Sequence, residues 1–459
     1  MQIIDPATEE LIADVAVDSA AVVAEKYARA RAAQPAWAAV PLEQRLAAIG
    51  RFKDALDARK EELARTLSRE VGKPIAQARN EISAMGGRLD FFLRETAAVL
   101  ADEVVLREGD AAVPKLEERI GHEPLGVVAN VSAWNYPYFV GSNVFVPALL
   151  AGNTVLYKPS EYATRTGLAI AELLHASGVP RDAFIAVIGA GDTGAALSAQ
   201  PVDALFFTGS HATGMRIAAA LAGRLVKLQL ELGGKDPTYV CDDADVRPAA
   251  EGLADGAFYN TGQSCCSVER IYVHRAVAEP FIAAFVATVR GFVLGDPQAD
   301  ATYIGPLARK AQVAVLEAQV ADAVAKGARL LCGGKRIDRR GHWFEPTVLA
   351  DATSDMLLMR DESFGPIIGI QTVANDDEAV RLMNDTEYGL TAGVYSRDRA
   401  RAQAILRRVD AGSVYWNCCD RVSPRLPWTG RRHSGIGSTL STHGIRTFLQ
   451  PKAWHLRAP

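Results

Sequence analysis

The run Gly126-Val127-Val128-Ala129-Asn130-Val131 opens the part of the sequence that decides the fold. It is short and almost uninterrupted in its apolar character, as expected of a strand buried on both faces. Similar runs alternate with segments of helical periodicity. The predicted strands cover residues 126–131, 154–157, 183–188, 204–207 and a run ending at 231, and the predicted helices cover 138–150, 164–176, a segment after 193, and 212–222. This alternation predicts a parallel sheet with helices on both faces and ligands beyond the carboxyl ends of its strands.

The segments on either side extend this α/β pattern. Residues 19–33, a stretch starting at Pro41, and residues 75–100 have the apolar spacing of helices. Downstream, the sequence predicts a helix at 246–260, turns at 305–307 and 345–348 that precede further β/α units, and a strand at 389–395. We therefore expect an α/β protein with two Rossmann-like parallel-sheet domains.

Composition is that of an ordinary globular protein with several domains. The chain has 459 residues, of which 49% are hydrophobic and 23% charged, enough for two or three domains with sizeable cores. A net charge of -4 and a pI near 6.1 give no electrostatic reason to expect nucleic acid or an anionic membrane as a partner. The first residues lack the features of a signal peptide, and the longest apolar runs are too short to span a bilayer. These features predict a cytoplasmic protein.

The cysteines and histidines do not form a metal-binding pattern. The cysteines lie at positions 241, 265, 266, 332, 418 and 419, and no two of them are spaced as Cys-x-x-Cys. The eight histidines are scattered. The sequence therefore predicts neither a disulfide framework nor a catalytic metal.

A candidate nucleophile stands in the segment 259–270. Cys265 follows small, turn-forming residues and precedes a β-rich run, so its sulfur is expected at the mouth of a cleft. Upstream, an alternating strand ends at Glu231 and is followed by Gly233 and Gly234, which places a carboxylate at the end of that strand. A cysteine and a carboxylate together suggest covalent catalysis followed by hydrolysis. Taken alone, a cysteine such as Cys265 is more often a small buried hydrophobic residue than a nucleophile. A carboxylate such as Glu231 is more often a solvent-exposed charge.

Two glycine-containing turns are candidates for binding phosphate. The turn at 189–194 spells G-x-G-x-x-G, but the acidic residue that should end the next strand is replaced by Phe207-Thr208-Gly209-Ser210. We therefore interpret the first turn as a tight turn and assign phosphate binding to the second, residues 208–214, where backbone N–H groups meet the start of a helix. A capped helix start explains the second turn about equally well.

Two other strand ends carry polar residues. Lys158 and Glu161 flank a stiff turn around Pro159 and are suited to holding ribose hydroxyls, although a surface ion pair has the same appearance. Asn135, after the strand 126–131, offers an amide donor to a developing oxyanion.

Six short motifs in the chain occur in the order and spacing of the aldehyde dehydrogenase superfamily, and the resemblance spans nearly the whole sequence. They are Trp134-Asn135-Tyr136-Pro137, Lys158-Pro159-Ser160-Glu161, Phe207-Thr208-Gly209-Ser210, Glu231-Leu232-Gly233-Gly234-Lys235, Gly262-Gln263-Ser264-Cys265 and Glu362-Ser363-Phe364-Gly365-Pro366. The chain thus resembles a hydrolytic, NAD(P)-dependent aldehyde dehydrogenase.

The resemblance implies roles for three catalytic residues. Cys265 would attack the aldehyde carbon, and the Asn135 amide with the Cys265 backbone N–H would hold the oxyanion of the thiohemiacetal. After hydride transfer, Glu231 would activate the water that hydrolyses the thioester, a step suited to a carboxylate whose pKa burial has raised. Cys266 would be a non-catalytic neighbour.

The resemblance also implies a dinucleotide site. Lys158 and Glu161 would hold the adenosine ribose, Gly209 and Ser210 the pyrophosphate, and Glu362 the nicotinamide ribose. Phe364 and Trp134 complete the predicted set of cofactor-binding residues. A carboxylate at Glu161 accepts a ribose 2′-hydroxyl but repels a 2′-phosphate, which favours NAD over NADP. Some members of the family use both.

The resemblance further implies a domain division and subunit pairing. Residues 1–105 and 124–231 would form the NAD-binding domain, and 232–440 the catalytic domain. Residues 106–123 and 441–459 would form a small β-extension for oligomerisation, since a lone amphipathic ribbon is not stable in water. A homodimer and a homotetramer both remain open.

Substrate identity is left open among aldehydes. By resemblance, the entrance would be lined by residues near Tyr136, Tyr138, Asn143, Tyr259 and Ser264 and by the segment 415–428. Aromatic residues there suggest a medium-sized or aromatic aldehyde, whereas Arg421 and Arg425 would suit a carboxylate-bearing semialdehyde unless they form structural ion pairs.

The sequence leaves two alternative functions and one regulatory role to consider. A CoA-acylating relative would use the same cysteine without needing Glu231, and a non-catalytic ligand-binding homologue would not need Cys265 or Asn135 either. Packing is the simpler role for Cys418 and Cys419, with a redox switch involving Cys265 or Cys266 as the alternative.

Overall fold

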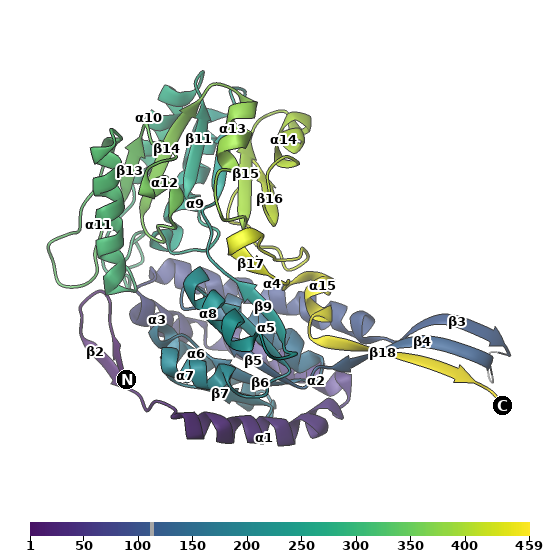
Figure 1. Cartoon of the computed structure of the whole chain (residues 1–459). Helices are drawn as coiled ribbons and strands as arrows, with labels where there is room; N and C mark the ends of the chain where they lie inside the picture. Colours follow the sequence, from purple (N-terminus) through teal and green to yellow (C-terminus); the bar gives the residue numbers. More distant parts are fainter. Residues whose placement is uncertain (111–113) are drawn as a thin grey trace.

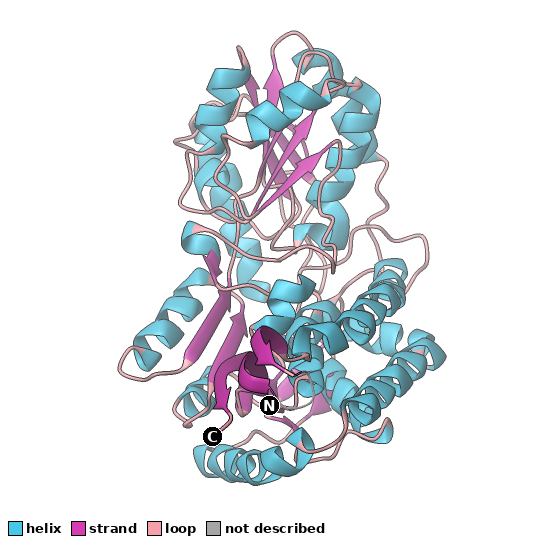
Figure 2. Cartoon of the chain, turned by 90° about the vertical axis from the view of Figure 1, so that its right-hand side faces the viewer, coloured by secondary structure: helices cyan, strands magenta, loops and turns pink. Residues whose placement is uncertain are grey.

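The computed structural model describes residues 1–110 and 114–459. It contains two parallel sheets, each flanked by helices, and a smaller three-stranded sheet that projects from the body of the molecule (Figure 1). Seen from the side, two α/β units lie one above the other (Figure 2). The predicted fold class, α/β with two Rossmann-like sheets and a small β-extension, is confirmed.

The first sheet has the strand order β17-β9-β8-β5-β6-β7, and every strand except β17 runs parallel to its neighbour. Its strands are β5 (Val127–Val131), β6 (Thr154–Lys158), β7 (Phe184–Ala186), β8 (Ala204–Thr208), β9 (Lys227–Glu231) and β17 (Gly435–Ile436). β5 is buried along its whole length because successive side chains enter different cores, Val127 on one face and Val128 on the other. The apolar run that predicted this strand is continuous because both faces of the strand are buried.

Helices cover both faces of the first sheet, and their buried side chains belong to two separate cores. On one face lie α5 (Pro137–Leu150) and α6 (Thr164–Ala176), preceded by η1 (Glu161–Ala163), with α2 (Leu42–Ala58), α3 (Lys60–Val71) and α4 (Ile75–Leu100) packed around them. On the other face lie α1 (Ala20–Ala38), α7 (Gly191–Ser198) and α8 (His211–Leu221).

The N-terminal helices follow the predicted periodicity with one break. The segment that starts at Pro41 is two helices, because Arg59 leaves the helical conformation and caps both α2 and α3. Gly72 then ends α3 in the left-handed conformation at φ 76°. Within the described part of the chain, no helix combines the length and apolar character needed to cross a membrane.

The second sheet has the order β12-β13-β14-β11-β10-β15-β16, and only the β12–β13 pair is antiparallel. Its strands are β10 (Pro237–Val240), β11 (Arg270–His274), β12 (Arg329–Cys332), β13 (Thr347–Ala350), β14 (Ile367–Val373), β15 (Thr391–Tyr395) and β16 (Ser413–Trp416). One face packs on α9 (Val246–Phe258) and α10 (Ala278–Arg290). The other packs on α11 (Lys310–Ala325), α12 (Leu357–Arg360), α13 (Asp376–Met383) and α14 (Arg399–Leu406).

The projecting sheet has the antiparallel order β18-β4-β3. It consists of β3 (Glu103–Gly109), β4 (Pro114–Pro124) and β18 (Leu449–Arg457), and α15 (Ser441–Arg446) precedes β18. β3 begins at Glu103, ahead of the predicted start at 106, and all of its residues are exposed. Residues 111–113 of the predicted extension lie outside the described residues. A short hairpin, β1 (Gln2–Ile4) and β2 (Leu11–Asp14), begins the chain.

Candidate active site

A cleft of about 790 Å³ lies at the carboxyl ends of β5, β6, β8 and β9. All ten side chains that the sequence singled out for catalysis or cofactor binding border it, although they come from both α/β units. They are Trp134, Asn135, Lys158, Glu161, Gly209, Ser210, Glu231, Cys265, Glu362 and Phe364. The structure thus brings the whole predicted set together in one place.

Cys265 follows a loop segment with a strained backbone, and hydrogen bonds hold that loop in place. The preceding segment η2 (Tyr259–Gly262) contains three consecutive left-handed residues, Asn260 at φ 54°, Thr261 at φ 59° and Gly262 at φ 71°. A Cβ at Gly262 would come within 2.2 Å of the Gly365 carbonyl oxygen, so only glycine fits there. Non-glycine residues in this conformation persist only where the surroundings hold them, which is common beside catalytic groups.

Asn135 is joined to the nucleophile loop by hydrogen bonds. Its side chain is buried, and its Nδ2 donates to the Gln263 carbonyl oxygen at 3.1 Å. In return, Asn260 Nδ2 donates to the Asn135 carbonyl oxygen at 3.2 Å. Gln263 is fixed in turn, because its Oε1 accepts the Ala308 N–H at 2.9 Å. An amide donor and a cysteine are therefore set in one rigid frame.

Glu231 ends β9 as a buried carboxyl group that is only half satisfied. Its Oε1 accepts a hydrogen bond from Gln229 Nε2 at 2.7 Å, whereas its Oε2 has no partner among the described residues. Burial raises the pKa of this carboxyl group well above its ordinary value, and the Gln229 hydrogen bond only partly opposes that effect. A raised pKa makes the ionised carboxylate a stronger base, which suits a group that takes a proton from water.

Glu362 and Phe364 enter the cleft from a loop anchored by a buried ion pair. Lys235 Nζ contacts Glu269 Oε2 at 2.6 Å, and both side chains are buried. Glu269 also accepts the Ser363 and Phe364 N–H groups, each at 3.0 Å. Glu362 accepts the Gly234 N–H at 3.0 Å, and burial raises the pKa of its carboxyl group to about 7.

Trp134 and Phe364 meet across the cleft. Their ring centroids are 5.6 Å apart with an interplanar angle of 78°, an edge-to-face contact. Trp134 follows β5 in the first unit, and Phe364 precedes β14 in the second. This contact therefore connects the two units at the cleft.

Lys158 ends β6 and Glu161 begins η1 just after it, and the two do not form a simple surface ion pair. Lys158 is buried, its Nζ donates to the Pro159 carbonyl oxygen at 3.3 Å, and burial lowers the pKa of its ammonium group. The Glu161 carboxylate accepts from the Ser160 hydroxyl at 3.3 Å. A buried cation with one weak acceptor is suited to a polar ligand in the cleft.

Both glycine turns reach the cleft. Ser210 caps α8 through its hydroxyl, which accepts the Thr213 N–H at 3.4 Å, and a Cβ at Gly209 would meet the Phe207 ring at 2.6 Å. Gly191 and Gly194, from the turn that we interpreted only as a tight turn, border the same cleft at the start of α7. The sequence did not indicate that this turn borders the cleft, because its position relative to the cleft depends on tertiary packing.

Gln312 of α11 and Arg309, directly before α11, also line the cleft, and the sequence patterns did not indicate them. Gln312 Nε2 donates to the Ser363 carbonyl oxygen at 2.6 Å, and Arg309 lies close enough to favour the ionised form of Glu362. No local motif marks these residues, because α11 reaches the cleft only through the packing of the second unit.

The predicted substrate entrance is partly wrong. Tyr138 lies in the core with 1% of its surface exposed, so it cannot line an entrance. Arg421 and Arg425 are exposed, and the Arg421 guanidinium donates to the Asp420 carbonyl oxygen at 3.4 Å. Tyr136 and Tyr259 are half-buried.

The other cysteines near the site are packed. Cys266 is buried, and its thiol donates to Asp420 Oδ1 at 2.9 Å. Its pKa is raised well above the ordinary value by the neighbouring Cys265 thiol, by burial and by the charge of Asp420. Cys419 lies under α9, where its thiol donates to the Gly252 carbonyl oxygen at 3.4 Å. The hypothesis of a redox switch stays a hypothesis.

Known proteins resemble the chain over nearly its whole length. The model of the Aldehyde dehydrogenase family matches residues 1–454. The betaine aldehyde dehydrogenase of Rhizobium etli (strain CIAT 652) is 35% identical over 452 residues, covering 97% of this chain and 92% of that protein.

Solved structures agree with this match. The crystal structure of an NAD-dependent aldehyde dehydrogenase from Sinorhizobium meliloti superposes with a TM-score of 0.94 at 35% identity, covering 100% of this chain and 92% of that chain. The crystal structure of PnpE in complex with nicotinamide adenine dinucleotide superposes with a TM-score of 0.95 at 32% identity, covering 100% and 94%.

Proposed function

The chain belongs to the aldehyde dehydrogenase family, and we propose that it oxidises an aldehyde to its carboxylic acid with NAD through a covalent intermediate on Cys265. The balanced reaction converts R–CHO, NAD⁺ and water into R–COO⁻, NADH and two protons. The observation that supports this proposal is the meeting of Cys265, Asn135 and Glu231 in one cleft.

The residues of the cleft fit a dinucleotide. It offers the N-termini of α7 and α8 to a pyrophosphate and the carboxylates of Glu161 and Glu362 to ribose hydroxyls. The half-satisfied cation of Lys158 would hold the adenosine ribose beside Glu161. When bound, NAD supplies a hydride acceptor for the carbon attached to Cys265. A 2′-phosphate would meet the Glu161 carboxylate, which favours NAD over NADP.

The protein's own groups then account for the remaining chemistry. The Cys265 sulfur attacks the aldehyde carbon, and the negative charge that develops on the oxygen is stabilised by the Asn135 amide and the Cys265 backbone N–H. After oxidation, Cys265 carries a thioester. Glu231 takes a proton from water at Oε2, the oxygen without a partner, and the hydroxide releases the acid and frees the thiol.

The test compares NADH formation in the wild type, Cys265→Ala and Glu231→Gln across aliphatic and aromatic aldehydes. We expect no turnover in Cys265→Ala and a burst of about one NADH per active site in Glu231→Gln, because the thioester would form but not hydrolyse. Cys332→Ala, which removes a cysteine on β12, is the control and should retain wild-type rates.

Two results would contradict this mechanism. Release of product only when CoA is supplied would assign the protein to the CoA-acylating type, and full activity in Cys265→Ala would exclude the covalent route. If no aldehyde yields NADH with the wild type, the proposed oxidation is wrong.

We also propose that the projecting sheet pairs subunits into a homodimer or homotetramer. Its strand β3 exposes Val104, Val105 and Leu106, of which Val105 is 63% exposed. Exposed apolar strands at a sheet edge pair readily with another chain. In this proposal residues 106–123 and 441–459 act as the oligomerisation extension. Val105→Glu should shift the mass measured by light scattering toward the monomer, and an unchanged mass would contradict this role.

A further inference from the structure

Two cations are buried against Tyr136 and Phe139, which lie one and four positions after Asn135. The rings of Tyr136 and Phe139 lie parallel, with centroids 6.0 Å apart and an interplanar angle of 8°. Lys73 Nζ lies 3.8 Å from the centroid of Tyr136, and Arg88 Cζ lies 4.3 Å from the centroid of Phe139. Both rings are half-buried, whereas Lys73 is fully buried and Arg88 is 5% exposed. We call Tyr136, Phe139, Lys73 and Arg88 the ring–cation cluster.

The two cations of this cluster are compensated very differently. Lys73 forms a buried ion pair with Glu81, and Glu81 Oε1 also accepts the Tyr138 N–H at 3.0 Å. The charge of Glu81 also acts on Arg88, so the two cations share this carboxylate. The one hydrogen bond recorded for Arg88 runs from Nη1 to Oδ1 of Asn143, a neutral amide, and its Nε–H has no partner among the described residues.

A guanidinium that is buried, shares its nearby carboxylate with Lys73 and keeps an N–H without a partner is costly unless a ligand completes its contacts. Burial lowers the pKa of Arg88 to about 10, which still leaves the guanidinium charged at neutral pH. Arg88 is also close enough to Cys266, the neighbour of Cys265, for the two to interact electrostatically. A guanidinium with an unused donor matches a carboxylate, which it binds in a fixed planar geometry.

The second acid near the cluster, Asp420, acts on Lys73 rather than on Arg88. Asp420 accepts the Cys266 thiol at 2.9 Å, burial raises the pKa of its carboxyl group, and Arg421 and Lys73 are its nearest cationic influences. Arg88 is not among the groups that perturb it. The arginines that the sequence suggested for a semialdehyde, Arg421 and Arg425, are exposed, so Arg88 is the buried candidate.

Resting on the proposed function, we propose that the aldehyde substrate carries a carboxylate and that Arg88 is the residue that recognises it. Cys265 and Asn135 hold the aldehyde group, and the cofactor fills the cleft on which both border. The rest of the substrate then lies against their chain neighbours, Cys266 and Tyr136, where the ring–cation cluster begins. A substrate with a quaternary ammonium group is disfavoured, because the ring faces that would bind such a cation already hold Lys73 and Arg88.

This substrate class differs from the one in the names of several relatives. Proteins that are 35% identical to the chain are called betaine aldehyde dehydrogenases, and betaine aldehyde carries a trimethylammonium group. At this identity the residues around the substrate are free to differ. The inference is therefore a specific claim about this chain.

The experiment measures kcat/KM for succinate semialdehyde, butanal and betaine aldehyde in the wild type, Arg88→Gln and Arg94→Gln. Arg94 is a matched control on the same helix, α4, because its guanidinium also lies over a phenylalanine ring, Phe91, at 5.8 Å, but 58% of its side chain is exposed. We expect the wild type to prefer succinate semialdehyde to betaine aldehyde by about tenfold or more. Arg88→Gln should lower the ratio of succinate semialdehyde to butanal by about 10- to 100-fold, mainly through KM, and Arg94→Gln should retain the wild-type ratio.

Each outcome has a distinct meaning. Oxidation of butanal together with an equal or better rate for betaine aldehyde would overturn the inference while leaving the proposed function intact. Failure to oxidise any aldehyde would overturn the proposed function itself. If Arg88→Gln does not fold, wild-type inhibition decides: competition by butyrate but not by choline supports the carboxylate site, and the reverse overturns it.

Discussion

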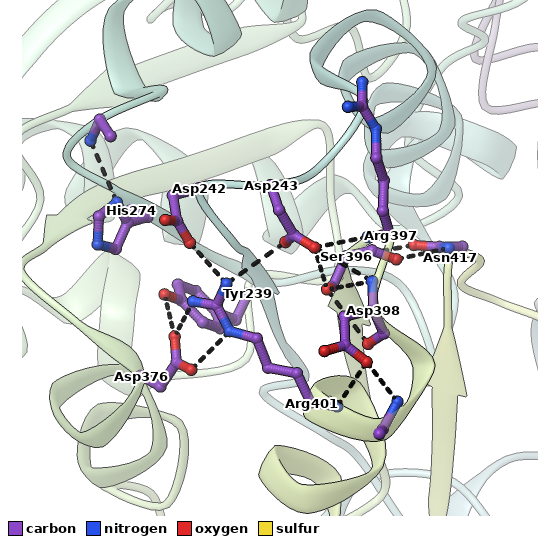
Figure 3. Close-up of polar contacts among 12 residues, drawn as sticks. Tyr239, Asp242, Asp243, His274, Asp376, Ser396, Arg397, Asp398, Arg401 and Asn417 are labelled. Carbon is purple, nitrogen blue, oxygen red and sulfur yellow. Dashed lines mark hydrogen bonds and ion pairs between the residues drawn. The ribbon is translucent and has the colours of Figure 1, made fainter.

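The two parallel sheets of this protein have the same build but use opposite edges. In the first, the carboxyl ends of β5, β6, β8 and β9 open onto the cleft of about 790 Å³. In the second, the corresponding edge is occupied by side chains that satisfy one another around Arg401 (Figure 3). The carboxyl ends of the first sheet therefore open onto the large cleft, whereas those of the second adjoin this network and a smaller cavity of about 260 Å³ beside β15 and β16.

The Arg401 network ties together most of the charged side chains at that edge. Its guanidinium contacts Asp242 at 2.7 Å and Asp376 at 2.6 Å, and Tyr239 Oη donates to Asp376 at 2.8 Å. Asp242 follows β10, and Asp376 begins α13 directly after β14. The charges at these strand ends are used internally, and the Arg401 guanidinium holds the pKa of Asp376 below its ordinary value.

The second sheet contributes to the active site from its amino edge instead. Cys265 precedes β11, Glu362 precedes β14, and Lys235 precedes β10. Because all three strands are parallel, their starts lie along one edge, and that edge faces the cleft. The comparison teaches that topology narrows the position of a site to an edge, while uncompensated polar groups decide which edge is used.

The largest predicted effect comes from breaking the buried pair at the amino edge. Lys235→Met leaves the Glu269 carboxylate buried without its cation, so we expect the free energy of unfolding to fall by about 3–5 kcal/mol. The loop that carries Glu362 should loosen as well, since Glu269 holds Ser363 and Phe364. Urea denaturation followed by circular dichroism measures the change. Lys310→Met, which removes an exposed pair with Glu9, should lower the free energy of unfolding far less than Lys235→Met does, and equal losses would contradict the distinction between a buried and an exposed pair.

Breaking the opposite edge should affect stability but not catalysis. Arg401→Met leaves Asp242 and Asp376 facing each other without a cation, and we expect a loss of about 2 kcal/mol because these groups are partly exposed. The kcat/KM of the folded enzyme should stay within about twofold. Arg399→Met on the same helix is the control, with a change below about 0.5 kcal/mol. A large loss of activity in Arg401→Met would mean that this edge does take part in function.

The pH dependence of NAD binding tests Glu362 at the amino edge. Its pKa of about 7 means that it is mostly protonated in mildly acidic solution and ionised above neutrality. An ionised carboxylate is the better acceptor for a ribose hydroxyl, so the Kd for NAD should fall about tenfold as pH rises from about 6 to about 8. Isothermal titration calorimetry measures this without catalysis. Glu362→Gln should flatten the profile, and an unchanged slope would assign the titration to another group.

The smallest predicted effect concerns the two glycine turns at the carboxyl edge of the first sheet. A Cβ at Gly191 meets no atom within 4 Å, so Gly191→Ala should change the Kd for NAD by less than about threefold. Gly209→Ala should raise it by about fivefold or more, because its Cβ would press on the Phe207 ring. If Gly191→Ala raised the Kd for NAD more than Gly209→Ala did, phosphate binding would be assigned to the G-x-G-x-x-G turn at 189–194 instead.

Much of the fold and the candidate site could be predicted from sequence because the signals are local. Continuous apolar strands and helical spacing gave β5, β6, β8, β9 and their helices close to the observed bounds. The ten site residues lie at strand ends or in the segments next to them, and parallel strands gather their ends along shared edges. Position in a motif therefore predicted position in space.

Other features could not be predicted because they depend on groups distant in sequence. Cys266 and Asp420 are 154 positions apart, and Gln312 reaches Ser363 across 51 positions. The core position of Tyr138 and the return of the 189–194 turn to the cleft are likewise results of packing. Sequence periodicity gives no direct information on such contacts.

The sequence by itself determined the fold class, the strand ends that carry chemistry and the identity of the candidate nucleophile, base and oxyanion donor, because each is written in a short contiguous pattern. Only the tertiary structure decided which charges are compensated. Arg88 and Arg401 look alike in the sequence, yet Arg88 is buried, donates to a neutral amide and shares Glu81 with Lys73, whereas Arg401 contacts several carboxylates of its own. The cost of a charge depends on the dielectric and the partners around it, and these are set when distant segments pack together.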